Sequence, residues 1–67
     1  MANILTKKEF DIIQDLLMIE EVACKKARLY SKILTNKKLA ENLKKLADNH
    51  LERFNALLEI IWGEYEL

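Results

Sequence analysis

Glu20 and His50 are the residues of this sequence best suited to chemistry, because each interrupts a row of apolar residues with helical spacing. The row in the first half contains Ile13, Leu17, Glu20, Cys24 and Ala27. The row in the second half contains Leu39, Leu43, Leu46, His50, Phe54, Leu57 and Ile61. A carboxylate and an imidazole placed in this way form either a buried hydrogen-bonded pair or part of a metal site.

Two helices must position this pair. Thr6 and Glu9 match a capping box, which predicts a first helix over about 7–34. Thr35 and Asn36 offer cap chemistry for a second helix over about 36–62, and Gly63 suits its C-terminal end. If the chain reverses near Thr35, antiparallel partners have residue numbers that add to about 70, which places Glu20 opposite His50.

The composition predicts one all-α domain over residues 1–67, since the chain has no proline and one glycine. A hairpin of this size is marginal alone, and its apolar stripes are wider than one partner helix covers. We therefore expect two antiparallel hairpins to form a homodimeric, ferritin-like four-helix bundle. The residues expected in the dimer core are Ile13, Leu17, Glu20, Cys24, Leu46, His50, Phe54 and Leu57.

The charges predict how two hairpins would stack. Basic residues gather towards the turn: Lys25, Lys26, Arg28, Lys32, Lys37, Lys38, Lys44 and Lys45. Acidic residues gather towards the open end: Glu9, Asp11, Asp15, Glu59, Glu64 and Glu66. Stacking with the turns at opposite ends brings unlike charges together. The balance of eleven basic and eleven acidic residues argues against a nucleic-acid partner.

The sequence also gives expectations about compartment. Cys24 is the single cysteine, so it forms no internal disulfide and is expected to be a buried, reduced thiol. The longest apolar run, from Leu16 to Ile19, is far short of a membrane span, and the N-terminus lacks a signal-peptide core. We expect a cytoplasmic protein without a membrane partner.

A twofold axis at the middle of the rod would bring Glu20 and His50 of both subunits to one level. Ferritin-like bundles hold two metal ions at such a level, with a Glu-x-x-His motif on two of the helices. Here Ala47 stands three residues before His50, so that motif is absent, and the remaining set suits at most one iron, manganese or zinc ion. The preferred interpretation is a register-setting pair without a cofactor.

No glycine-rich loop, nucleophile constellation or long loop is present to build a catalytic pocket. We therefore expect a protein that is not an enzyme, with no catalytic residues. A ferritin-like, metal-dependent oxidoreductase that uses Glu20 and His50 from two subunits is the alternative.

Three segments resemble the coat F family of spore coat proteins: Asp15-Leu16-Leu17-Met18-Ile19-Glu20, Asn49-His50 and Trp62-Gly63-Glu64-Tyr65. The likeness covers about residues 12–65, and Glu20 and His50 are the positions that carry over. Ala47 departs from the family pattern, in which an acidic residue is common there. The resemblance implies a ferritin-like helical protein of structural or assembly function, located in the spore coat or cytoplasm, with other coat proteins as partners.

Overall fold

The first helix begins where the capping box predicts. The structure is a computed structural model that describes residues 5–65, and its helix α1 spans Lys7–Ile33. The Glu9 amide donates to Thr6 Oγ1 at 3.1 Å, and the Thr6 amide donates to Glu9 Oε1 at 2.9 Å. These two bonds satisfy amide groups that a helix N-terminus otherwise leaves without partners.

The second helix, α2, spans Lys37–Tyr65. Asn36 caps it, because its side-chain oxygen accepts a hydrogen bond from the Leu39 amide at 2.9 Å. The helix does not end at Gly63, as the sequence suggested, but continues through this residue without a positive φ angle. Glycine is enriched at helix ends because it tolerates the left-handed conformation, yet a helix interior also accommodates it at a cost of about 1 kcal/mol.

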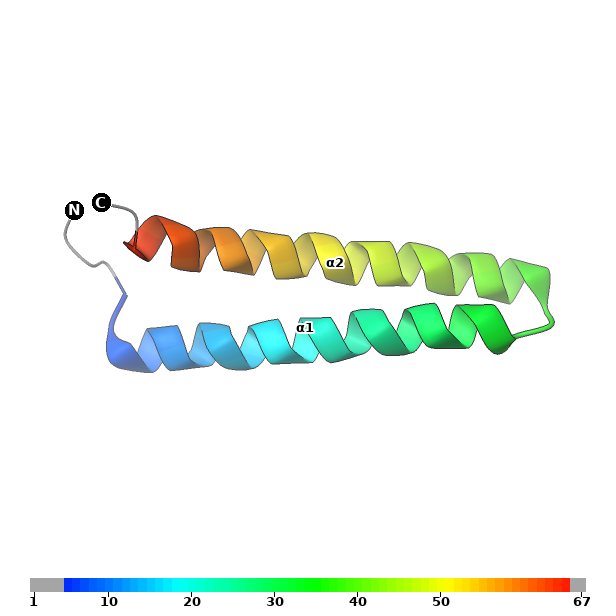
Figure 1. Ribbon diagram of the computed structural model, residues 1–67, viewed down its shortest axis with the longest axis horizontal. Helices are drawn as coiled ribbons and strands as arrows, with labels where there is room; N and C mark the ends of the chain where they lie inside the picture. The colour runs from blue at the N-terminus through cyan, green and yellow to red at the C-terminus, as the bar shows by residue number, and fades with distance from the viewer. Residues whose placement is uncertain (1–4, 66–67) are drawn as a thin grey trace.

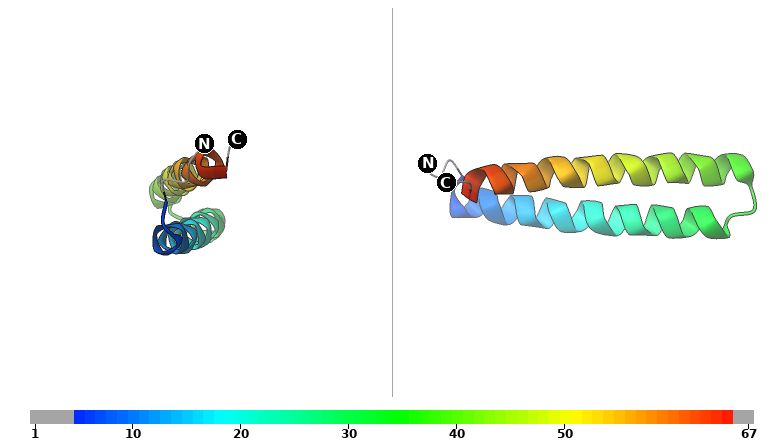
Figure 2. Two further views of the ribbon diagram at one scale, coloured as in Figure 1. Left: turned by 90° about the vertical axis from the view of Figure 1, so that its left-hand side faces the viewer. Right: turned by 45° about the horizontal axis from the view of Figure 1, so that its top comes forward.

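The two helices lie side by side and antiparallel, so that α1 begins and α2 ends at the same end of the molecule (Figure 1). Viewed along the rod, they cross at a shallow angle (Figure 2). The principal extents are 51 × 18 × 11 Å. The described part of the chain is thus an all-α helical hairpin, and neither helix has a stretch long and apolar enough to cross a membrane.

The contact between the helices follows a seven-residue repeat, with spacings of three and four residues, as in an antiparallel coiled coil. We call these residues the seam. On α1 the seam contains Phe10, Ile13, Leu17, Glu20, Cys24, Ala27 and Ser31, and all are buried or half-buried. On α2 it contains Ala40, Leu43, Ala47, His50, Phe54, Leu57 and Ile61, likewise buried or half-buried.

The core of the single hairpin is small. Among the described residues, the only apolar side chains in the buried class are Ala27 and Ala47, and Ala47 has no exposed surface. Ser31 is buried too, and its hydroxyl donates to the Arg28 carbonyl at 2.6 Å. No large side chain in this part of the chain is fully buried, so one hairpin removes little apolar surface from water.

Candidate functional site

Glu20 on α1 and His50 on α2 meet at the middle of the seam, as their positions in the sequence predicted. His50 Nδ1 lies 2.5 Å from Glu20 Oε1. The Glu20 side chain is 16% exposed and the His50 side chain 18%, so the contact is largely shielded from water. The layer of the seam that contains them is therefore polar, with apolar layers on both sides.

Arg53, one turn after His50 on α2, completes a cluster of three residues. Its Nε donates to Glu20 Oε2 at 3.1 Å, and its Nη2 lies 2.9 Å from His50 Nδ1. The Arg53 side chain is 52% exposed, so it reaches into the seam from its edge. Sequence reasoning missed this residue. The signal that could have found it is its spacing of three from His50, which puts both side chains on one helix face.

The presence or absence of a hydrogen on His50 Nδ1 decides which of its two contacts is a hydrogen bond. Arg53 can only donate, and ionised Glu20 can only accept. His50 Nδ1 therefore bonds to Glu20 when it carries a proton and to Arg53 when it does not. The Glu20 pKa is lowered, first by the hydrogen bond from His50 and also by Arg53, against the opposing effect of burial. This keeps Glu20 ionised near neutral pH and favours the arrangement in which Nδ1–H donates to it.

The cluster of Glu20, His50 and Arg53 does not fit the metal site of a ferritin-like bundle. Both carboxylate oxygens of Glu20 already have partners, and one partner is the guanidinium cation of Arg53. Ala47, at the place of the missing motif glutamate, faces into the seam with no exposed surface. Within residues 5–65 no three His, Cys, Asp or Glu side chains come together as a metal site would require.

The structure places the residues expected in the dimer core at two kinds of position. Seven of them belong to the seam within one hairpin: Ile13, Leu17, Glu20, Cys24, His50, Phe54 and Leu57. Leu46 does not, because it is 42% exposed and Ala47 takes the adjacent seam position. Leu39 is likewise 47% exposed, and Ala40 lies in the seam instead. The burial of the seven seam residues comes from their own hairpin and requires no second subunit.

A second apolar surface lies beside the seam. On both helices it includes residues that directly precede a seam position, and such residues flank the same edge of an antiparallel pair. We call it the second apolar face. It contains Ile12, Leu16, Ile19, Ala23, Tyr30 and Ile33 of α1 with Leu39, Leu46 and Ile60 of α2. Eight of these nine side chains are large and between 41% and 65% exposed.

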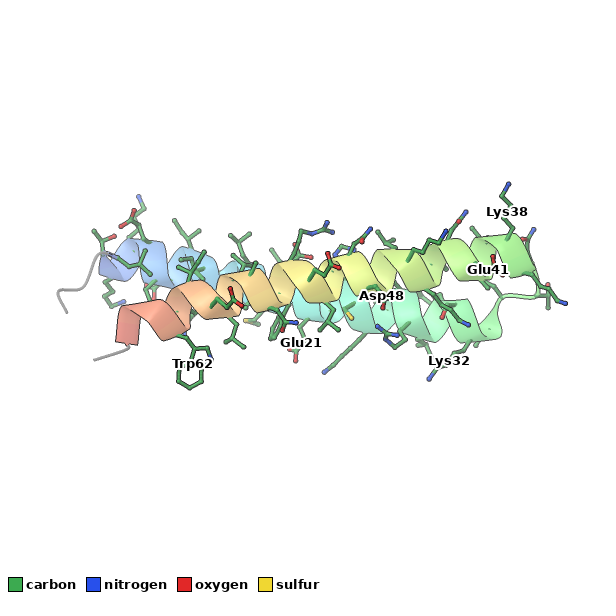
Figure 3. The ribbon with its side chains drawn as sticks, turned by 90° about the horizontal axis from the view of Figure 1, so that it is seen from above. Glu21, Lys32, Lys38, Glu41, Asp48 and Trp62 are labelled. Carbon is green, nitrogen blue, oxygen red and sulfur yellow. The ribbon has the colours of Figure 1, made fainter. Side chains whose placement is uncertain are left out.

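The opposite edge of the hairpin is more polar. It carries an ion pair between Arg28 Nη2 and Asp48 Oδ1 at 3.2 Å, which together with Cys24 raises the pKa of Arg28. Glu21, Lys32 and Trp62 project along this edge (Figure 3). A hollow of about 180 Å³ on this edge is lined by Glu21, Cys24, Lys25, Leu51 and Phe54. This is smaller than a typical small-molecule pocket of about 300–1,000 Å³.

Comparison with known proteins adds no further assignment. No family model, curated protein or solved structure matches this chain. The candidate site therefore rests on the chain's own geometry: a polar cluster in the seam and an apolar face beside it.

Proposed function

We propose that the chain is a non-enzymatic assembly protein that pairs with a second copy of itself through the second apolar face. The observation that carries this proposal is the extent of the face, which follows α1 from Ile12 to Ile33 and α2 from Leu39 to Ile60. Scattered apolar residues are normal on a surface, but a row that follows two helices marks an interaction site. The product would be a four-helix bundle.

The surface area of the hairpin supports a partner of this size. The accessible surface is 5507 Å², whereas a compact monomer of 7.9 kDa exposes about 4,400 Å². The excess is about 1,100 Å² per chain, and two copies that bury it would form an interface of about 2,200 Å². Interfaces of that size are typical of stable homodimers. A second hairpin is thus large enough to bury a surface of this size.

The polar cluster supports an assembly role rather than catalysis. Both Glu20 oxygens and His50 Nδ1 are engaged within the cluster, and the hollow on the polar edge is lined by neither His50 nor Arg53. A catalytic acid or base needs access to a bound substrate. The sequence resemblance to coat F proteins supports a spore coat as the place of assembly, with other coat proteins as further partners. The protein would then act by its shape and its contacts.

Sedimentation analysis of two substitutions on α1 tests the proposal. Ile19 lies on the second apolar face and is 61% exposed, whereas Leu29 is 56% exposed and lies off that face. We expect Ile19→Lys to shift the protein from about twice its monomer mass of 7.9 kDa to the monomer. Leu29→Lys, which also replaces an exposed aliphatic side chain by lysine, should leave the dimer intact.

Two results would contradict the proposal. A wild-type protein that sediments as a monomer up to the concentrations used for structural work would exclude the homodimer. Equal loss of the dimer in Ile19→Lys and Leu29→Lys would show that the second apolar face is not the interface.

A further inference from the structure

Two pairs of residues on the second apolar face lie symmetrically about one level of the rod. On α2, Leu39 and Ile60 lie about equally far from Asn49 in opposite directions. On α1, Leu16 and Ala23 flank Ile19 in the same way, within one residue. Ile19 and Asn49 lie on either side of the Glu20–His50 contact and are only about 3 Å apart along the rod, at 1.5 Å per residue. The two pairs therefore share nearly the same centre.

From this symmetry we infer how the second copy lies, an inference that rests on the proposed homodimer. The two hairpins face each other with their turns at opposite ends, α1 against α1 and α2 against α2. The twofold axis crosses the rods at right angles at the level of Ile19 and Asn49. The alternative twofold axis, parallel to the rods, would put the turns together and α1 against α2. Geometry allows only these two symmetric arrangements of face-to-face hairpins.

Charge decides between the two arrangements. Residues 21–49, which form the turn half of the rod, contain eight basic and three acidic residues. Residues 5–20 and 50–65, which form the open half, contain three basic and seven acidic residues. Turns at opposite ends place the basic half of each copy beside the acidic half of the other, whereas turns together oppose like charges. Each pair is weak, but they all favour the same arrangement.

Side-chain size is compatible with this axis. It puts Leu16 opposite the partner's Ala23, so a large side chain meets a small one. It puts Leu39 opposite the partner's Ile60, so the apolar ends of α2 cover each other. Leu46 lies opposite the partner's Arg53, whose aliphatic stem can cover the leucine while its guanidinium stays with Glu20.

Pulsed electron paramagnetic resonance between two spin labels of the dimer tests the arrangement. The labels are placed on Lys38→Cys or on Glu52→Cys, each in a Cys24→Ser background. Lys38 projects from the turn end of α2 (Figure 3). Lys38 and Glu52 are both exposed and lie two seven-residue repeats apart, so their side chains leave α2 in the same direction. Glu52 is thus the matched control for Lys38.

The two arrangements give different distances. With the turns at opposite ends, the Lys38 labels are separated by about 35 Å along the rod and the Glu52 labels by about 8 Å, at 1.5 Å per residue from the centre. The expected result is a Lys38 distance clearly longer than the Glu52 distance. With the turns together, each label sits at the level of its twin and the two distances are equal, which would overturn the inference. Absence of any distance between chains would instead refute the homodimer itself.

Discussion

Ala47→Glu is the substitution that most directly separates a closed seam from a metal site. It restores the Glu-x-x-His spacing of ferritin-like bundles, so a metal-binding seam should tolerate it or gain metal. In the structure Ala47 has no exposed surface and faces the other helix at the level next to Glu20 and His50. A carboxylate there has no route to water and competes with Glu20 for the partners that Glu20 already holds.

The expected cost follows from this burial. Burying an unpaired carboxylate costs several kcal/mol, and the free energy of unfolding of a domain this size is on the order of 3–10 kcal/mol. Ala47→Glu should therefore lose most of its stability in urea unfolding followed by circular dichroism at fixed protein concentration. Ala47→Leu, which adds volume without charge, should lose about 1–3 kcal/mol and remain measurable.

The control introduces the same residue outside the seam. Asn55 is exposed on α2, so Asn55→Glu should change the unfolding free energy by no more than about 0.5 kcal/mol. The reasoning is refuted if Ala47→Glu is as stable as Asn55→Glu, above all if it also retains zinc or iron through gel filtration. Such a result would mean that the seam has room for a metal and that Arg53 yields its place beside Glu20.

Two further predictions concern the α2 cap and the dependence of stability on pH. Asn36→Ala should cost about 1 kcal/mol in the same unfolding assay, because it removes the side-chain oxygen that caps the Leu39 amide. Asn36→Asp should retain the cap, and Thr35→Ala should be near neutral. Equal effects of Asn36→Ala and Thr35→Ala would contradict the cap. The pKa of Glu20 is lower in the folded state than its ordinary value of 4.5, so the unfolded chain binds more protons at acidic pH. The melting temperature should therefore fall as the pH falls from about 5 through the folded pKa of Glu20. Glu20→Gln should flatten this acid limb more than Glu59→Gln, an exposed control, and an unchanged slope would show that the contact with His50 does not form in solution.

The hairpin and its central contact were predictable because polar residues in apolar rows restrict the register. The turn could be placed near Thr35 from cap chemistry alone, and the positions of Glu20 and His50 about that turn then required them to meet. The capping box of Thr6 and Glu9 is likewise a local signal, and the structure confirms it. The capping box joins residues three apart in the sequence, and the Glu20–His50 contact follows from the position of a single turn.

The sequence pattern did not separate two neighbouring apolar residues that compete for one seam position. In the pairs Leu39–Ala40 and Leu46–Ala47, the larger residue was assigned to the seam, but the repeat that passes through His50 selects the alanine. A small side chain lets the two helix backbones approach closely, which hydrophobicity alone does not reveal. Leucine is then left on the outside, where it contributes to the second apolar face. The choice of alanine for the seam therefore also creates the surface that we propose as the interface.

The polar cluster of Glu20, His50 and Arg53 fixes the register of α1 against α2, which the apolar layers alone cannot do. A seam with a seven-residue repeat can slide by one repeat and still pair apolar residues with apolar residues. Sliding α2 in this way would put Leu43 or Leu57 opposite Glu20 and leave the carboxylate buried without a partner. Arg53 adds to this constraint, since it reaches Glu20 only in the observed register and from the edge that carries the second apolar face. The cluster thus fixes how α1 meets α2, and so fixes which leucines and isoleucines line up at the surface that we propose a second copy covers.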